Sequence, residues 1–142
     1  NPYLASFKIK KIKKNNDLIY LSSNFDGIKK FKFSDRFLFL NFLKKVDKFV
    51  KNQKIHRIIV KNHPGEKSNK YNFIKNLKIK DLKFEKVKKN YKLEDVLKST
   101  KYVAGYDTMG LVVGKLFKNF VINLKYKNLK LSIPKKYVDM YL

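Results

Sequence analysis

The chain has 142 residues, no cysteine and a formal net charge of +24 at pH 7. This length suits one domain with a hydrophobic core and is short for two. The lack of cysteine excludes disulfides, thiolate catalysis and cysteine-ligated metal, and it fits a reducing cytoplasm. No apolar run approaches the roughly 18 residues that span a bilayer. We therefore expect a single cytoplasmic domain over residues 1–142. Because it begins at Asn1 without a leader, we expect a fragment of a longer protein.

The positive charge has two explanations. A selected surface for nucleic acid or anionic lipid is one of them. However, only Arg36 and Arg57 are arginines among the 35 basic residues, whereas base reading and bidentate phosphate recognition favour arginine. The lysines are spread over the whole chain beside abundant Asn, Ile, Phe and Tyr, as compositional drift in an AT-rich genome produces. Either explanation implies some attraction to anionic headgroups, so we expect the inner face of the cytoplasmic membrane as a location.

Short apolar runs alternate with longer amphipathic ones. "DLIYLSS" (17–23) predicts a buried strand. Ser34 is a suitable cap for a helix to Asn52, whose apolar positions recur at helical spacing: Phe39, Leu43, Val46 and Val50. A strand over 55–62 follows. The next predicted elements are a helix over 69–77, a strand over 82–87, a helix over 93–100 and a strand over 101–107.

The remaining pattern predicts a helix capped by Thr108 and ending near Phe117, then a strand over 119–126. The last stretch, "LSIPKKYVDMYL", fits no element clearly. Strands and helices alternate without a hairpin signal between strand-like runs. The predicted fold class is therefore α/β, a single Rossmann-like domain with an open, mostly parallel sheet of five to six strands and flanking helices.

Two of the predicted strands end in unusual loops. "NHPGE" (62–66) follows one strand, and its proline and glycine cannot continue that strand. "GYDTMG" (105–110) ends another strand and leads into a helix, whose free N–H groups form an anion site. Ligands of open parallel sheets bind outside the carboxyl ends of the strands. The two loops therefore predict a site for a phosphorylated small molecule.

Each of these residues also has a purely structural interpretation. His63 can hydrogen-bond its own loop, and Thr108 can act as a helix cap alone, worth roughly 1 kcal/mol. The spacing of Gly110 and Gly114 favours close packing of the helix on the sheet over ligand contact. His56, inside a predicted strand, is expected to be structural. Two acidic residues, Glu94 and Asp95, suit the first turn of a helix. Two histidines and scattered carboxylates give no familiar metal-ligand spacing, so no metal is expected.

The order of these motifs resembles the C-terminal, donor-nucleotide-binding half of GT-B glycosyltransferases. It is most similar to bacterial groups that build surface polysaccharide: sialyl- and polysialyltransferases, capsule Kdo transferases and teichoic-acid glycerophosphotransferases. Those groups share a Lys-x-His-Pro segment, later a Gly/Asp-x-Ser-Ser/Thr segment, and then "ALLGKPVI". Here "KNHP" (61–64) matches the first segment and "GYDTMGLVVGKLFKNFVIN" (105–123) matches the second. The resemblance spans residues 18–126.

The resemblance implies that His63 donates a hydrogen bond to a donor phosphate oxygen and so stabilises the charge that develops on the leaving nucleotide. It implies further donor contacts from Lys61, Pro64, Gly65, Gly105, Asp107, Thr108, Met109 and Gly110, with Glu94 near the ribose or base and Lys67 adding charge. One position departs from the family, because Asp107 stands where the first serine is usual. An acid beside a phosphate is unfavourable unless it points away, so we expect Asp107 to fix the loop.

In GT-B enzymes the acceptor site belongs to an N-terminal domain, and nothing in this chain forms a second such unit. The resemblance therefore implies the donor half of a metal-independent glycosyltransferase, inactive without that partner domain. It also implies a CMP- or UDP-linked nucleotide sugar as ligand, no other cofactor and no specific nucleic acid. Three alternatives stay open. One is a nucleotide-sugar epimerase domain of the same architecture, and another is a basic, non-catalytic module that binds polyanions or nucleic acid. The third is a non-catalytic interaction domain that keeps the fold without selective nucleotide binding.

Overall fold

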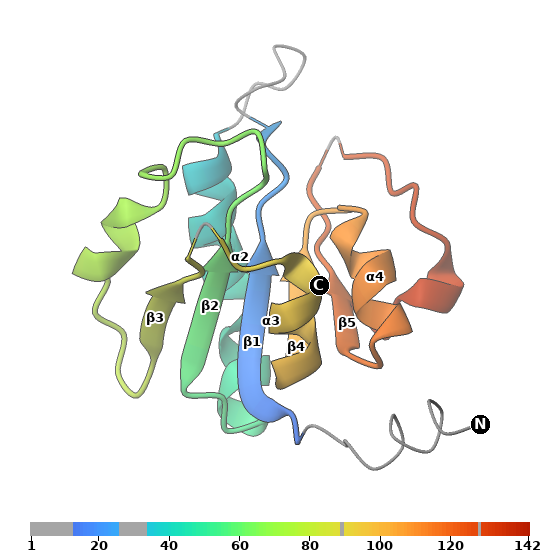
Figure 1. Cartoon of the computed structure of the whole chain (residues 1–142), viewed down its shortest axis with the longest axis horizontal. Coiled ribbons are helices and arrows are strands. Elements are labelled where there is room, and N and C mark those ends of the chain that lie inside the picture. The colour runs from blue at the N-terminus through green and yellow to red at the C-terminus, as the bar shows by residue number, and fades with distance from the viewer. Residues whose placement is uncertain (1–12, 26–33, 89, 128) are drawn as a thin grey trace.

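The protein, described here by a computed structural model over residues 13–25, 34–88, 90–127 and 129–142, is built on a six-stranded sheet (Figure 1). The strand order is β3-β2-β1-β4-β5-β6, and every pair of neighbouring strands runs parallel. This is the order of the doubly wound dinucleotide-binding fold. The predicted α/β class with an open parallel sheet is confirmed. The predicted domain boundaries, 1–142, include positions 1–12 and 26–33, which lie outside the described residues.

The elements follow the predicted alternation. The strands are β1 (Asn15–Leu21), β2 (Arg57–Lys61), β3 (Lys83–Lys86), β4 (Thr100–Gly105), β5 (Phe120–Asn123) and β6 (Met140–Tyr141). The α-helices are α2 (Asp35–Asn52), α3 (Leu93–Ser99) and α4 (Gly110–Leu116), and the 3-10 helices are η2 (Asn72–Asn76) and η3 (Lys135–Tyr137). No helix in the described ranges is long and apolar enough to cross a bilayer.

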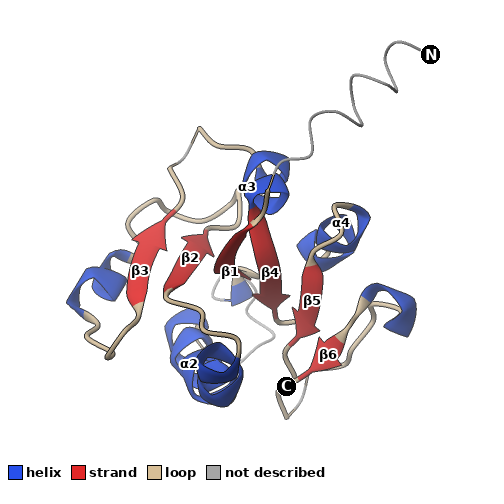
Figure 2. Ribbon diagram, turned by 90° about the horizontal axis from the view of Figure 1, so that it is seen from below, coloured by secondary structure: helices blue, strands red, loops and turns tan. Residues whose placement is uncertain are grey.

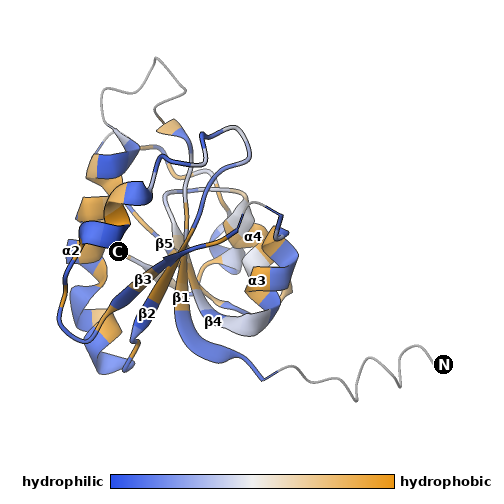
Figure 3. Cartoon of the chain, turned by 60° about the vertical axis from the view of Figure 1, so that its left-hand side comes forward, coloured by the Kyte–Doolittle hydropathy of each residue, from blue (hydrophilic) through white to orange (hydrophobic). Residues whose placement is uncertain are grey.

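The helices cover both faces of the sheet. Side chains alternate along a strand, so Leu18 and Tyr20 of β1 join the core under α2, whereas Ile19 and Leu21 join the core under α3 and α4. Figure 2 shows α2 on one face with α3 and α4 on the other, and Figure 3 shows the sheet, with apolar stretches in its strands, between these layers. Gly114 lets α4 approach the sheet, because a Cβ there would lie 2.8 Å from a methyl of Val103.

Helix α2 begins and packs as its sequence predicts. Phe37 N–H donates to the Ser34 hydroxyl at 3.1 Å, which confirms Ser34 as the N-cap. Phe39 and Phe42 are fully buried against Tyr20 of β1, with ring centroids 5.0 and 4.6 Å from the Tyr20 ring. Such aromatic packing stabilises a core beyond the area it buries. Helix α2 thus packs firmly on one face of the sheet and helps to hold β1, whose end borders the candidate site.

Two segments differ from the sequence prediction. The helix expected over 69–77 is the shorter 3-10 helix η2. Its Ile74 and the flanking cap residues Tyr71 and Leu77 lie three apart, which matches three residues per turn rather than 3.6. The unplaced end of the chain forms η3 and β6, where Asp139 accepts hydrogen bonds from Lys115 and from Val121 N–H. A two-residue strand is too short to show a hydrophobic period.

Candidate functional site

The two unusual loops meet at the carboxyl edge of the sheet. The strand order reverses between β1 and β4, and this switch point is where open α/β sheets bind ligands. A cleft of about 220 Å³ lies there, lined by the ends of β1 and β2, by α3 and by the loop after β4. Its lining residues are Leu21, Ser22, Lys61, Asn62, His63, Pro64, Leu93, Thr108, Met109 and Gly110. The predicted convergence of residues 61–64 with residues 108–110 is therefore present.

The His63 ring is held by its own loop. Gly65 N–H donates to Nδ1 of His63 at 3.1 Å, so Nδ1 is the acceptor nitrogen and the neutral ring carries its hydrogen on Nε2. The structural interpretation of His63 is correct for Nδ1, and it leaves Nε2–H as a donor. The role of Gly65 in this loop is its N–H bond to the ring. The lack of a side chain is not required for space, since a Cβ at this position would meet its neighbours only at ordinary contact distances, 3.4 Å or more.

The loop after β4 differs in one respect from prediction. Thr108 is not the cap of α4: Met109 is the N-cap residue, and no side chain caps this helix. The first turn closes instead through the backbone, with Leu111 N–H donating to the Thr108 carbonyl at 3.0 Å. The N–H groups of Met109 and Gly110 come before this first bond, in the part of a helix where N–H groups lack intrahelical partners. Helix α4 has seven residues, so its dipole adds little.

Two glycines allow this loop to lie close to β1. A Cβ on Gly110 would lie 2.6 Å from a methyl of Leu21, and a Cβ on Gly105 would lie 2.7 Å from the Thr108 methyl and 3.3 Å from the Leu21 carbonyl oxygen. Larger side chains would therefore force the loop away from the strand end. Gly105 is buried beneath the cleft rather than part of its lining.

Asp107 fixes the loop, as expected from its departure from the serine pair. Its carboxylate accepts hydrogen bonds from Asn123 Nδ2 at 3.1 Å, from Ser132 N–H and hydroxyl at 2.8 Å each, and from Ile133 N–H at 3.2 Å. The backbone has φ 50° at Asp107, a left-handed conformation that Asp tolerates better than most residues. The acid is thus engaged by the 132–133 segment and by β5. Partial burial raises the pKa of Asp107, but these hydrogen bonds lower it, and the net pKa lies below its ordinary value.

This arrangement predicts a pH-dependent effect of Asp107→Asn. A carboxyl whose folded-state pKa is depressed stabilises the fold above its unfolded pKa and loses that contribution as pH falls through the folded pKa. We expect the variant to be about 1 kcal/mol less stable at pH 7, a value kept small because the carboxyl is only partly buried. The difference should shrink below pH 3.8, where the wild-type carboxyl begins to protonate. Thermal unfolding from pH 7 to pH 2.5 measures it, and a pH-independent difference would contradict this role.

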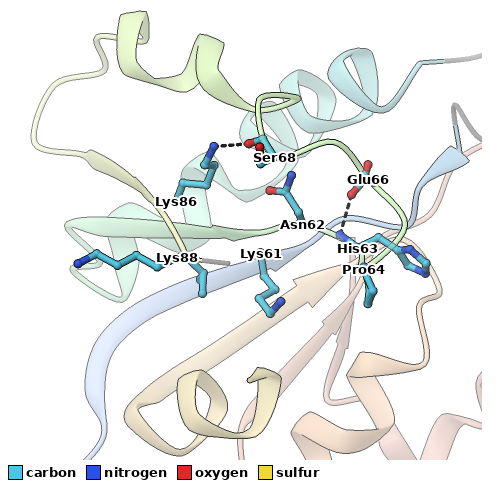
Figure 4. Close-up of a pocket in the computed structure, with 9 residues that line it drawn as sticks. Lys61, Asn62, His63, Pro64, Glu66, Ser68, Lys86 and Lys88 are labelled. Carbon is cyan, nitrogen blue, oxygen red and sulfur yellow. Dashed lines mark hydrogen bonds between the residues drawn. The ribbon is translucent and has the colours of Figure 1, made fainter. Parts of the chain in front are cut away.

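A larger cavity of about 540 Å³ adjoins the cleft between the ends of β2 and β3 (Figure 4). Its lining residues are Lys61, Asn62, His63, Pro64, Glu66, Ser68, Lys86, Val87 and Lys88. The first four of these also line the cleft, so the two spaces share the His63 loop as a wall. The Lys86 ammonium donates hydrogen bonds to the Ser68 carbonyl and to Asn72 Oδ1. Lys61 is the lysine that lines both the cavity and the cleft.

Sequence reasoning missed Glu66. Its side chain is 0% exposed, and it accepts hydrogen bonds from His63 N–H at 2.7 Å and from the Ser22 hydroxyl at 3.0 Å. Lys70 forms ion pairs with Glu66 and, at 2.5 Å, with buried Asp35 at the start of α2. The spacing of Glu66 and Lys70, four residues apart, was the available signal. In a lysine-rich loop it reads as an ordinary exposed pair.

Three other predicted residues lie outside both spaces. Glu94 is exposed in the first turn of α3, as its structural interpretation expects, and it lines neither the cleft nor the cavity. Lys67 is exposed and contributes its carbonyl to Asn62 Nδ2. His56 is exposed just before β2, rather than within it, and its Nδ1 lies 3.2 Å from the Asp81 carbonyl oxygen.

The site's chemistry rests on hydrogen-bond donors and lysines. Within the described ranges, no group of three or more His, Cys, Asp or Glu side chains is placed to hold a metal ion. No protein-family model, no curated protein and no solved structure matches this chain. What the cleft binds is therefore inferred from its lining, which combines Lys61 and His63 of one loop with Thr108 of the other.

Proposed function

We propose that this domain binds the phosphate of a nucleotide sugar between its two loops, as the donor half of a metal-independent glycosyltransferase of bacterial surface-polysaccharide synthesis. One observation carries the proposal: the cleft at the strand-order switch point is lined by both loops, and His63 there has Nδ1 already occupied by Gly65 N–H. An anionic ligand is favoured because the donors facing this edge are N–H groups and a lysine. The resemblance of "KNHP" and "GYDT" to that family supports the specific ligand.

The proposed chemistry is charge stabilisation on the leaving phosphate. As a glycosidic bond to the donor phosphate breaks, negative charge grows on the phosphate oxygens. His63 Nε2–H donates to one of them and Lys61 adds a positive charge nearby, and preorganised donors of this kind cost no reorganisation during reaction. Thr108 and the N–H groups of Met109 and Gly110 hold the phosphate from the opposite side. Asp107 does not oppose this binding, because its carboxylate is bonded to the 132–133 segment.

The larger cavity supplies space for the nucleoside. Its volume of about 540 Å³ lies within the range of roughly 300–1,000 Å³ that is usual for small-molecule sites. A ligand whose phosphate lies in the cleft can extend past His63 and Pro64 into this cavity, since both residues line both spaces. This placement replaces Glu94 as the expected nucleoside contact. In this proposal a partner domain holds the acceptor. The net charge of +24 favours association of the domain with an anionic membrane surface.

A nucleotide screen tests this proposal. We expect one nucleotide among CMP, CDP, UDP and GDP to raise the unfolding temperature selectively at 0.3 M salt, where the Debye length is well below about 10 Å and nonspecific attraction is weak. Inorganic pyrophosphate should bind more weakly, and a short oligonucleotide serves as the polyanion control. An equal response to every polyanion would favour a basic polyanion-binding module instead.

Val87→Trp separates the two parts of the proposed site. Val87 lines the larger cavity and is absent from the cleft lining, and its N–H donates to the Val60 carbonyl of β2 just after β3 ends. A tryptophan side chain reduces the space for a nucleoside. We expect the selected nucleotide to bind at least about tenfold more weakly, a loss of roughly 1.4 kcal/mol, while pyrophosphate binding stays unchanged. Calorimetric titration measures both, and equal losses for both ligands would contradict a nucleoside subsite.

A further inference from the structure

The buried carboxylate of Glu66 connects the fold to the His63 loop. Each of its oxygens has a protein donor: Oε1 accepts His63 N–H at 2.7 Å, and Oε2 accepts the Ser22 hydroxyl at 3.0 Å and is paired with Lys70. Ser22 directly follows β1 and is itself buried, with its oxygen 2.6 Å from the Tyr71 hydroxyl. Glu66 therefore joins an exposed loop to the end of a central strand.

The bonds continue from Glu66 to the imidazole ring. Glu66 N–H donates back to the His63 carbonyl at 2.9 Å, so residues 63 and 66 are joined by two hydrogen bonds that close a tight turn. Within that turn Gly65 N–H reaches Nδ1 of the ring. Figure 4 shows Glu66 inside the curve of the loop, bonded to the His63 backbone, while the His63 ring points away from the carboxylate.

Burial of this charge is hard to explain by stability alone. Removing a carboxylate and an ammonium from water carries a desolvation cost that their attraction often fails to exceed, and apolar replacements of similar volume are frequently as stable. A carboxylate is nevertheless the group that accepts an N–H, a hydroxyl and an ammonium at once. The geometry fits a role in orientation, because one of these three donors is the backbone of the proposed phosphate-binding histidine.

We propose that Glu66 is the positioning residue of the site, which holds the turn at residues 63–66 so that the His63 ring keeps Nδ1 bonded and Nε2–H available. Its effect on ligand binding rests on the proposed function, whereas its effect on the ring does not. Lys70 and Ser22 hold the carboxylate in place from the α2 side and from β1. Glu66 also lines the larger cavity, but donors of the protein engage both of its carboxylate oxygens.

Glu66→Gln tests the proposal in the ligand-free protein. The amide keeps the shape of the side chain but has a single acceptor oxygen, so its NH2 group faces either His63 N–H or the donors of Lys70 and Ser22. We expect the ¹⁵N signals of the His63 ring to change from a dominant Nε2–H tautomer to a mixture, and the affinity for the selected nucleotide to fall at least tenfold. Glu85→Gln is the matched control, because it removes an equal charge from an exposed carboxylate paired with Arg57 and should change neither signal.

The unsubstituted protein provides a second test that does not depend on the variant's folding. The His63 amide is bonded to a buried carboxylate although the residue is exposed, so its hydrogen exchange should be at least tenfold slower than that of exposed Lys67. Equal exchange rates, or an unchanged His63 ring spectrum in folded Glu66→Gln, would overturn the proposal. If the ring responds but wild-type protein binds no nucleotide, the positioning role stands and the proposed function fails.

Discussion

Replacing Lys70 by methionine is expected to lower the free energy of unfolding by about 3–5 kcal/mol, the usual result of removing one partner from a buried ion pair. The Lys70 side chain is 16% exposed and lies between two carboxylates, Asp35 at 1% and Glu66 at 0% exposure. Methionine has similar length, so the loss of charge dominates over the loss of packing. Two buried carboxylates would then lose the ammonium that lies between them.

The measurement is urea unfolding at pH 7 with Lys51→Met as the control. Lys51 pairs with Asp47 on the surface of α2, where both side chains are more than half exposed, so its removal should cost at most about 0.5 kcal/mol. Equal small losses from the two variants would show that the pairs of Lys70 with Asp35 and Glu66 do not support the fold. A large loss from Lys70→Met alone would place these buried charges among the main determinants of stability.

The contribution of Lys70 also has a defined pH range. Partial burial lowers the pKa of Lys70, but its bonds to Asp35 and Glu66 raise it, and the net pKa lies above its ordinary value of 10.5. A lysine with a raised folded-state pKa stabilises the fold fully below its unfolded pKa and loses that contribution as pH rises through the folded one. The difference between wild type and Lys70→Met should therefore be constant near neutrality and decrease above pH 10.5.

The fold could be predicted because its signals are local. Apolar runs at positions such as 18–21 and 58–60, separated by amphipathic stretches, indicate parallel strands with crossover helices without any knowledge of tertiary contacts. The strand order could not be read from these patterns, since the buried runs of the central strands β1, β4 and β5 resemble one another. The two-residue strand β6 is held by contacts of Asp139 with β5 and α4, which no periodicity reveals.

The candidate site could be predicted in outline for a similar reason. The carboxyl ends of parallel strands share one edge, so His63 and Thr108 were expected near each other once their strands were identified. Their detailed roles depend on distant partners. The Asp107 carboxylate is bonded to Asn123 and Ser132, which lie 16 and 25 positions away in sequence, and the Glu66 carboxylate is bonded to Ser22, 44 positions away. Long-range hydrogen bonds of this kind leave no spacing pattern in a single sequence.

Nonspecific attraction to the many lysines is the main alternative explanation for any anion binding by this protein. Lysines are spread along the whole chain, so a polyanion can associate without a specific site, and such binding weakens steeply with salt. The cleft differs from these lysines because its donors are fixed in direction: an imidazole held by Gly65 and N–H groups at the start of α4. A substitution that removes one directed donor without changing the lysines therefore separates the two kinds of binding.

His63→Ala is that substitution, and we expect it to weaken nucleotide binding by about 10- to 100-fold. A hydrogen bond to a charged group contributes roughly 1.5–3 kcal/mol, and each 1.4 kcal/mol is a tenfold change in affinity. The fold should be little affected, because the ring is exposed and is bonded within the described residues to Gly65 N–H of its own loop. In a full-length enzyme the same change should lower turnover, since charge on the leaving phosphate increases in the transition state.

His56→Ala is the matched control, since it removes the chain's other imidazole. His56 lies at the opposite end of β2 from His63, with its ring near the Asp81 carbonyl. Titration calorimetry at 0.3 M salt should give the wild-type dissociation constant for this control. If both variants bind as the wild type does, the His63 loop is a turn without a ligand, and the lysines account for any anion binding. If His63→Ala alone loses affinity, the sensitivity must come from a donor fixed at the strand-order switch point, because both variants retain all 35 lysines and arginines.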